Sequence, residues 1–234
     1  MSLLKQMFGA KPQLTASQVD RLRAWRDQPE PDTRLPFDAS RLVVVDVETS
    51  GLDVRKDHLI AIGAVTVVNG KIILADSLDI VLQQRYVSGK DNILIHGIGG
   101  EAQRQGMHPA DALLAFLEFL GKSPLIAFHV EFDQSMIGRA MKAHLGFRFE
   151  HTWADLAYVA PALYPQLARR YRSLDKWMEL FGIGNYARHS ALADALATAE
   201  LLLALRPQLE ARQTMSFQSL RDLERERRLQ THPI

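Results

Sequence analysis

The chain has 234 residues, of which 47% are hydrophobic and 24% are charged, a globular composition that excludes disordered, collagen-like and coiled-coil proteins. Its 28 basic and 27 acidic side chains nearly balance, so it is not a generic binder of polyanions. It has no cysteine, which excludes disulfides and cysteine-bound zinc and leaves carboxylates and histidines to hold any metal. We expect a soluble, cytoplasmic protein with no membrane partner, because no apolar run approaches the roughly 18 residues of a spanning helix and the first residues lack a signal-peptide core.

Residues 1–40 are predicted to form a helical extension followed by a linker. The segment Thr15-Ala-Ser-Gln18 has the pattern of a capping box, which predicts a helix from there to about Asp27. Two prolines within residues 29–32 then end the helix. The main domain is therefore expected over residues 41–205.

The first part of this domain is rich in β-branched residues with a period of two. The pattern predicts strands over 42–47, 59–68 and 71–79. Asn69-Gly70 separates the last two runs, and Asn-Gly between apolar runs is a strong signal for a tight hairpin. We expect a three-stranded antiparallel meander.

The second part alternates helices with short apolar strands. Residues 96–100, His-Gly-Ile-Gly-Gly, are predicted as a loop, and Pro109 then begins a helix that Gly121 ends. The further elements expected are a strand over 123–129, a helix over 133–144, a strand over 151–154, and helices over 174–181 and 191–205. This order predicts an α/β fold with a mixed sheet covered by helices on both faces. Residues 206–234 are predicted as a C-terminal helical tail.

Two carboxylates stand at the end of the first predicted strand, in Asp46-Val-Glu48-Thr-Ser-Gly-Leu. Because side chains alternate along a strand, Asp46 and Glu48 point to the same face. Two carboxylates placed there repel each other unless a cation neutralises them. The alternative is a strand end that frays into solvent, with both carboxylates hydrated.

Two further polar positions follow apolar elements. Asp133 follows the strand over 123–129, where its alternative role is the N-cap of a helix. His189 and Asp194 open the last long helix, and with Ser190 as N-cap they occupy two positions that meet on one face. The alternative there is a surface histidine beside an ordinary acid of the first helical turn.

These residues together predict a metal site and identify a family. Strand ends of a mixed sheet form its ligand crevice, and carboxylates converging there suit hard cations such as Mg²⁺. The order Asp-x-Glu-Thr-Ser-Gly-Leu, then Phe-Asp after a strand, then His-x4-Asp on a late helix resembles the DEDDh-type 3′-5′ exonucleases, which include the DNA polymerase III epsilon subunit, ribonuclease T and oligoribonuclease. The resemblance covers about residues 41–205 and implies a ribonuclease H-like fold that hydrolyses nucleic acid from its 3′ end.

The resemblance also implies a role for each of these residues. Asp46, Glu48, Asp133 and Asp194 would hold two divalent cations, Mg²⁺ or Mn²⁺, with Asp133 often acting through water. His189 would be the general base, and a histidine with an ordinary pKa near 6.5 can take a proton from water at neutral pH. Two cations clamp the attacking and leaving oxygens of an in-line displacement, so no covalent intermediate is required.

The second motif departs from the family pattern. Phe128-His129 stands where family members often have His-Asn. We expect this change to alter how the terminal nucleotide is held and to leave the acidic set complete.

Five other residues match family positions that contact the terminal nucleotide. Thr49, Leu52 and Phe132 are implied as its backbone and apolar contacts, with plain core packing as the alternative for Phe132. His96 and Ile98 resemble further positions of this kind, and a structural loop histidine is the alternative for His96. An aromatic face stacks on any base, which suits an enzyme that does not read sequence.

We therefore expect a metal-dependent exonuclease that releases nucleoside 5′-monophosphates from single-stranded or frayed 3′ ends of DNA, with RNA as the alternative substrate. Nucleic-acid 3′ ends are the expected partner, and a DNA polymerase is a further candidate. Two other hypotheses stay open. One is a non-catalytic module of the same fold that binds nucleic acid or a polymerase. The other is a different two-metal phosphodiesterase that acts on nucleotides.

Overall fold

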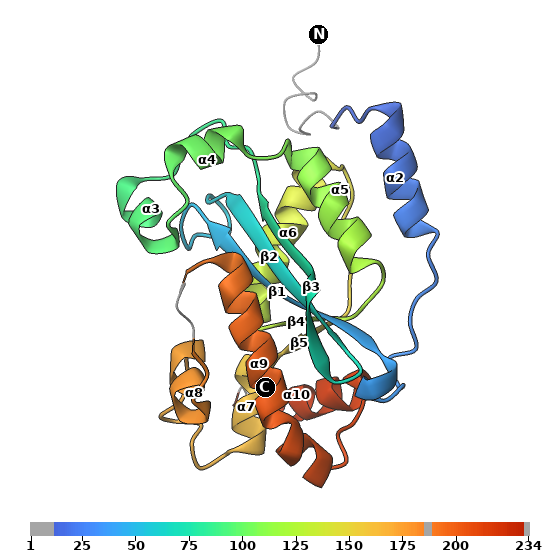
Figure 1. Cartoon of the computed structure of the whole chain (residues 1–234), viewed down its shortest axis with the longest axis vertical. Helices are drawn as coiled ribbons and strands as arrows, with labels where there is room; N and C mark the ends of the chain where they lie inside the picture. The colour runs from blue at the N-terminus through green and yellow to red at the C-terminus, as the bar shows by residue number, and fades with distance from the viewer. Residues whose placement is uncertain (1–11, 185–188, 232–234) are drawn as a thin grey trace.

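The computed structural model describes residues 12–184 and 189–231. Its centre is a five-stranded sheet with the strand order β3-β2-β1-β4-β5 (Figure 1). The strands are β1 (Arg41–Thr49), β2 (Leu59–Val68), β3 (Lys71–Val81), β4 (Leu125–Ala127) and β5 (Trp153–Asp155). Strands β1, β2 and β3 pair antiparallel, whereas β4 pairs parallel with both β1 and β5. The predicted meander and the mixed sheet are confirmed.

Helices cover both faces of this sheet. They are α2 (Ala16–Arg26), α3 (Lys90–His96), α4 (Gly100–Gln105), α5 (Pro109–Leu120), α6 (Val130–His144), α7 (Leu156–Leu163), α8 (Leu174–Phe181), α9 (Ala191–Ala211) and α10 (Phe217–Thr231), with a short 3-10 turn η1 (Phe37–Ala39) before β1. Helices α5 and α6 pack on one face, and α9 packs along β1, β2 and β3 on the other.

The two faces of β1 enter two different hydrophobic cores. Val43, Val45 and Val47 pack in the core that contains α5 and α6, whereas Leu42 and Val44 pack in the core that contains α7, α8 and α9. Side chains alternate along a strand, so the even-numbered residues that follow Val44 also lie on the α9 face. The strand thus aims its terminal carboxylates at the helix that begins with the predicted histidine motif.

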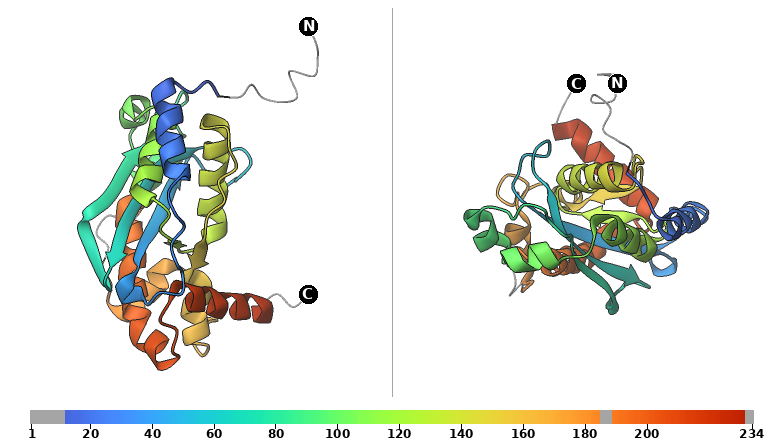
Figure 2. Two further views of the ribbon diagram at one scale, coloured as in Figure 1. Left: turned by 90° about the vertical axis from the view of Figure 1, so that its right-hand side faces the viewer. Right: turned by 90° about the horizontal axis from the view of Figure 1, so that it is seen from above.

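The N-terminal and C-terminal helices pack against the main domain. Thr15 caps α2 through the predicted capping box, in which its hydroxyl accepts the N–H of Gln18 at 3.2 Å. Helix α2 lies beside α5 (Figure 2), where Arg21 pairs with Asp111 and Glu118. Helix α10 packs on α7 and β5. No helix within the described residues is long and apolar enough to cross a membrane.

The segment predicted as a loop over residues 96–100 is a loop only over residues 97–99, and it connects two short helices that were not predicted. His96 is the last residue of α3, and Gly100 is the first residue of α4. Gly97 ends α3 with a φ of 71°, in the left-handed region that glycine adopts without steric cost. Helices of 7 and 6 residues are too short to produce a periodic pattern in the sequence.

Three helix predictions also differ from the structure. Helix α6 begins at Val130, so Asp133 lies inside its first turns and is not an N-cap. Helix α7 is absent from the predicted elements. Helix α9 continues to Ala211 through Pro207, because the burial of Leu205 and Leu209 on either side outweighs the hydrogen bond that proline cannot donate. The three-part division of the chain at residues 40 and 205 stays a prediction.

Candidate active site

The end of β1 meets the first turn of α9 across a glycine. In the antiparallel ladder between β1 and β2, Asp46 lies opposite Gly63. A Cβ atom on Gly63 would stand 2.0 Å from the backbone N of Leu192 and 2.1 Å from the backbone C of Ala191. Only glycine therefore allows α9 to approach the sheet this closely. The close approach brings Asp194, in the same helical turn, to the end of β1.

The start of α9 has the predicted cap geometry. Ser190 is the N-cap, and Asp194 is the fourth residue of the helix. The two predicted positions do meet, because the backbone N–H of His189 donates to Asp194 Oδ2 at 3.1 Å. His189 has a φ of 63° and its side chain is exposed, while Asp194 is buried. The side chain of His189 is thus exposed at the N-terminus of α9, and the carboxylate of Asp194 is buried next to its backbone.

Three of the four predicted acids converge at this point. Asp46, Glu48 and Asp194 each offer a carboxylate oxygen, and these atoms all lie within 4.8 Å of one another. Asp46 and Glu48 are half-buried. An all-oxygen set of this kind fits a hard divalent cation such as Mg²⁺ or Mn²⁺, which leaves coordination positions for water and phosphate. The donor set therefore fits the metal that the sequence motif predicts.

Asp133 lies next to this cluster without joining it. It is 4% exposed, on the first turns of α6. Burial raises the pKa of Asp133 well above its usual range, and the neighbouring charges of Asp155 and Glu48 raise it further, while backbone hydrogen bonds at Asp133 and Val47 act in the opposite direction. Its position beside Glu48 is compatible with a contribution through water, and its role as a ligand stays a prediction.

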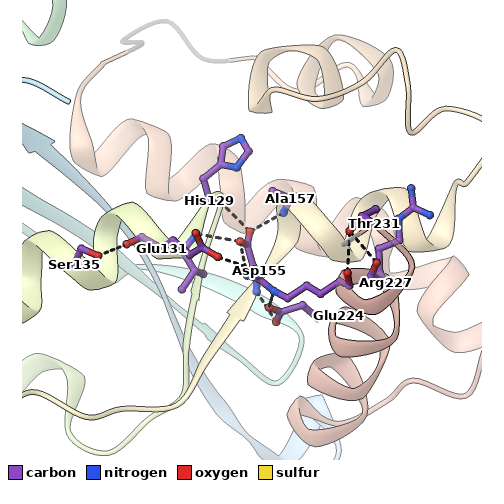
Figure 3. Close-up of polar contacts among 10 residues, drawn as sticks. His129, Glu131, Ser135, Asp155, Ala157, Glu224, Arg227 and Thr231 are labelled. Atoms are coloured by element: carbon purple, nitrogen blue, oxygen red, sulfur yellow. Dashed lines mark hydrogen bonds and ion pairs between the residues drawn. The ribbon is translucent and has the colours of Figure 1, made fainter. Parts of the chain in front are cut away.

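The turn that leads into α6 is held by one buried carboxylate. His129 joins β4 to α6 with a φ of 70° and a ψ of 53°, a conformation that is uncommon for a residue other than glycine. Asp155, at the end of β5, accepts the backbone N–H of His129 at 3.0 Å and that of Val130 at 3.2 Å (Figure 3). It also accepts the N–H of Ala157 at 2.9 Å. One side chain therefore fixes the starts of α6 and α7, and through α6 it places Asp133.

Arg228 of α10 completes this network from outside the predicted domain. Its guanidinium donates to Asp155 at 3.1 Å, to Glu224 at 2.7 Å and to Glu131 at 2.9 Å. Glu224 accepts the backbone N–H of Asp155 at 3.0 Å (Figure 3). The guanidinium also lies 3.9 Å from the ring centroid of Tyr158. Burial raises the pKa of Asp155, whereas its N–H donors and Arg228 lower it.

Neither Asp155 nor Arg228 is among the site residues that the sequence predicts. An aspartate between a strand and a helix is a preferred N-cap, and this was the available signal for Asp155. Arg228 stands among alternating Arg and Glu residues of a polar segment, where no local pattern distinguishes it. Only the packing of α10 against β5 reveals its partner.

The predicted apolar contacts for the terminal nucleotide have different environments. Leu52 is 86% exposed and offers its side chain to solvent beside the end of β1. Thr49 is buried, and its hydroxyl donates to the carbonyl of Gly51 at 2.7 Å, which orders the turn after the strand. Phe132 is half-buried against the core that contains α5 and α6. Contact of these three residues with a nucleotide stays a prediction.

His96 is a buried residue whose ring is engaged within its own segment. Its Nδ1 accepts the N–H of Ile98 at 2.9 Å, so Nε2 carries the proton and donates to Asn92 Oδ1 at 2.8 Å. Burial lowers the pKa of His96. This geometry is that of a structural histidine, placed at a helix end and not in a loop. Ile98 is half-buried beside it, and the nucleotide contacts of both residues stay predictions.

Clustered carboxylates at the strand ends of a mixed sheet are typical of metal-dependent phosphoryl-transfer enzymes. The family model RNase_T, described as Exonuclease, matches residues 43–202, which is more than half of the chain. The chain therefore belongs to this exonuclease family. The predicted enzyme class and family resemblance are confirmed.

Two of the relatives that the chain matches are DNA polymerase III proteins. It is 30% identical over 200 residues to the PolC-type DNA polymerase III of Thermotoga maritima, a match that covers 86% of this chain and 14% of that protein. It is also 30% identical over 168 residues to the DNA polymerase III subunit epsilon of Aquifex aeolicus, covering 71% of this chain and 81% of that subunit. The chain thus spans a small part of the PolC-type polymerases that it matches and most of the epsilon subunit.

Solved structures confirm the predicted ribonuclease H-like fold. E. coli exonuclease I in complex with a dT13 oligonucleotide superposes with a TM-score of 0.61 at 19% identity, covering 74% of this chain and 42% of that one. The cell-death related nuclease CRN-4 has a TM-score of 0.63 at 16% identity, covering 74% of this chain and 64% of that one. At these identities the likeness carries the fold alone.

Proposed function

We propose that this protein is a divalent-metal-dependent 3′-to-5′ exonuclease that removes nucleoside 5′-monophosphates from single-stranded or frayed ends of DNA. The observation that supports this most strongly is the cluster of Asp46, Glu48 and Asp194, whose carboxylate oxygens lie within 4.8 Å of one another. The cluster lies at the N-terminus of α9, where His189 is exposed. Membership of the exonuclease family supports the reaction. The names of the polymerase relatives support DNA over RNA, a cytoplasmic location and a DNA polymerase as partner.

The chain's own residues divide the work as follows. The carboxylates of Asp46, Glu48 and Asp194 would hold two cations, and Asp133, next to Glu48, would contribute through a water molecule. When bound, the cations stabilise the negative charge that develops on the phosphate in the transition state. His189, exposed at the start of α9, accepts the proton of the attacking water at a ring nitrogen. Leu52 and Phe132 hold the terminal nucleotide through apolar contact, which reads no base edges.

The test is end-specific cleavage of a labelled strand with an isosteric variant. A 5′-labelled DNA strand should shorten one nucleotide at a time with Mg²⁺ or Mn²⁺ and stay intact in EDTA. Asp46→Asn should abolish cleavage because it removes one ligand charge without changing the side-chain volume. The matched control is Asp20→Asn, on the exposed face of α2, which should cleave like the wild type.

Four outcomes would contradict this proposal. Internal cuts, or cleavage that EDTA leaves unchanged, would refute the metal-dependent exonuclease. Binding of DNA without cleavage would favour the non-catalytic module. Cleavage of mononucleotide esters with none of polynucleotides would favour another nucleotide phosphodiesterase. The same label on RNA and on annealed strands with matched or mismatched 3′ ends tests the substrate form.

A further inference from the structure

A large groove lies on the opposite face of the sheet from the acidic cluster. It has a volume of about 1220 Å³, and its walls come from α6, the start of α5, the start of β2 and the segment after β3. Helices α5 and α6 pack on the face of β1 that Val45 and Val47 enter, whereas Asp46 and Glu48 face α9. The groove is therefore distinct from the carboxylate site.

The groove is nevertheless joined to that site through the loop after β1. The backbone N–H of Ser50 donates to the carbonyl of His58 at 2.9 Å, and the N–H of His58 donates to the Ser50 hydroxyl at 2.9 Å. In the β1–β2 ladder, Thr49 lies opposite Leu59. His58 and Leu59 both line the groove. One end of the groove thus lies against the strand end that carries Glu48.

The lining of the groove is strongly basic. Among the lining residues that the structure describes, Asp57 is the only carboxylate, and it is used locally, since it accepts from the Ser50 hydroxyl at 2.9 Å and from the N–H of Asp53 at 2.8 Å. The basic lining residues are Arg85, Arg139, Lys142, His58, His108 and His144. Burial lowers the pKa of His144, and the neighbouring His108 and His58 lower it further, so His144 adds no charge at neutral pH. The positive charge of the groove comes from Arg85, Arg139 and Lys142. A cluster of like charges in a groove attracts an anionic ligand.

The structure also supplies an aromatic surface at the rim. Tyr86 is 72% exposed, and the guanidinium of Arg85 lies 5.4 Å from its ring centroid. Cationic side chains that follow a phosphate backbone, together with an exposed aromatic ring, are the features by which proteins bind single-stranded nucleic acid without reading sequence. An isolated phosphate would use the charges and leave the ring without a role.

We propose that this groove binds the phosphodiester backbone of single-stranded nucleic acid beyond the terminal nucleotide, with Arg85 and Lys142 on the phosphates and Tyr86 against a base. The inference rests on the proposed function, because it names how that substrate is held. It adds a binding surface on the α5 and α6 face that the carboxylate site does not require. A longer strand should therefore be bound more tightly than a short one.

The variant for the test is Arg85→Ala combined with Lys142→Ala. Both side chains are exposed, and neither has an ion pair among the residues that the structure describes. Arg139 is unsuitable because it donates to the carbonyls of Val54 and Asp57 and so holds the loop. The matched control is Lys71→Ala combined with Arg212→Ala, an equal loss of charge at exposed residues outside the groove.

The measurement is kcat/KM for 3′-end cleavage of a trinucleotide and of a fifteen-nucleotide strand over a range of salt concentrations. The wild type should prefer the long strand. The groove variant should lose about 2- to 30-fold on the long strand, the range for two exposed ion pairs. Its slope of log(kcat/KM) against log[salt] should become shallower by about 0.7 per lost phosphate contact on a single strand. Trinucleotide cleavage should not change, and the control variant should match the wild type.

Two results would overturn the groove assignment. One is equal behaviour of the groove and control variants on the long strand. The other is a loss that occurs only when the fifteen-nucleotide strand is annealed to its complement, measured as a third substrate, which would assign the groove to paired nucleic acid. If the wild type cleaves neither strand, the proposed function fails instead. In that case the affinity for the long strand, measured by fluorescence anisotropy, tests the groove directly. Equal affinity of the groove and control variants would refute the groove assignment.

Discussion

Replacing Gly63 with alanine should separate the two halves of the acidic cluster. The added Cβ would stand 2.0 Å from the backbone N of Leu192, where ordinary contact begins at 3.4 Å. The obstructing atoms belong to the backbone of α9, so no side-chain rotation can relieve the clash. Either β2 or α9 must therefore move by more than about 1 Å, a displacement that typically costs about 100-fold in rate. If α9 moves, Asp194 moves away from Asp46; if β2 moves, it displaces Asp46, which is paired with Gly63.

The same displacement predicts weaker metal binding, because ligand distances in a metal site tolerate only about ±0.2 Å. Overpacking should also cost about 1–3 kcal/mol of folding stability. The assay therefore measures the rate per folded molecule, Mn²⁺ affinity by calorimetry, and the unfolding midpoint. Gly63→Ala should lose rate and affinity together.

Gly138→Ala is the matched control for this experiment. Gly138 lies inside α6, and an added Cβ there would meet no atom within 4 Å. The control should keep its activity and gain about 0.5–1 kcal/mol of stability, since alanine is the better helix former. A Gly63→Ala protein with wild-type rate and Mn²⁺ affinity would refute the argument that this glycine assembles the site.

Three further predictions follow from the structure. His189→Gln should lower kcat by about 10²- to 10⁴-fold, the usual loss of a general base, and a comparable loss of Mn²⁺ affinity by calorimetry would reassign His189 as a ligand. Arg228→Met should lower both the urea midpoint of unfolding and kcat, because it leaves buried Asp155 without its cation, and Arg228→Lys should recover part of each. If kcat is unchanged in a destabilised Arg228→Met protein, the ion pair contributes to stability and not to catalysis. Burial lowers the pKa of His151, so below the unfolded value of about 6.5 only the unfolded state gains that proton. Stability should therefore fall by up to about 1.4 kcal/mol per pH unit below 6.5, and urea titrations at pH 7.5 and 5.5 should show a smaller fall for His151→Gln.

Local pattern alone determined much of this protein. Alternation along the first strand placed Asp46 and Glu48 on one face, and the cap at Ser190 brought His189 into contact with Asp194. The Asn69-Gly70 turn determined the hairpin between β2 and β3. Each of these features depends on residues that are close in sequence, where side-chain period and backbone preference act directly.

The tertiary structure decided how close these elements come. Nothing in the period of β2 marks Gly63 as the position where α9 presses on the sheet, because that contact joins segments far apart in the chain. The same holds for Asp155, whose carboxylate meets Arg228 only after α10 has packed against β5. Distances between elements are set by which side chains fill the space between them, and that packing is a property of the whole fold. The sequence therefore predicted which acids belong to the site. The packing of the elements determines that Asp46, Glu48 and Asp194 form one cluster and that Asp133 lies beside it.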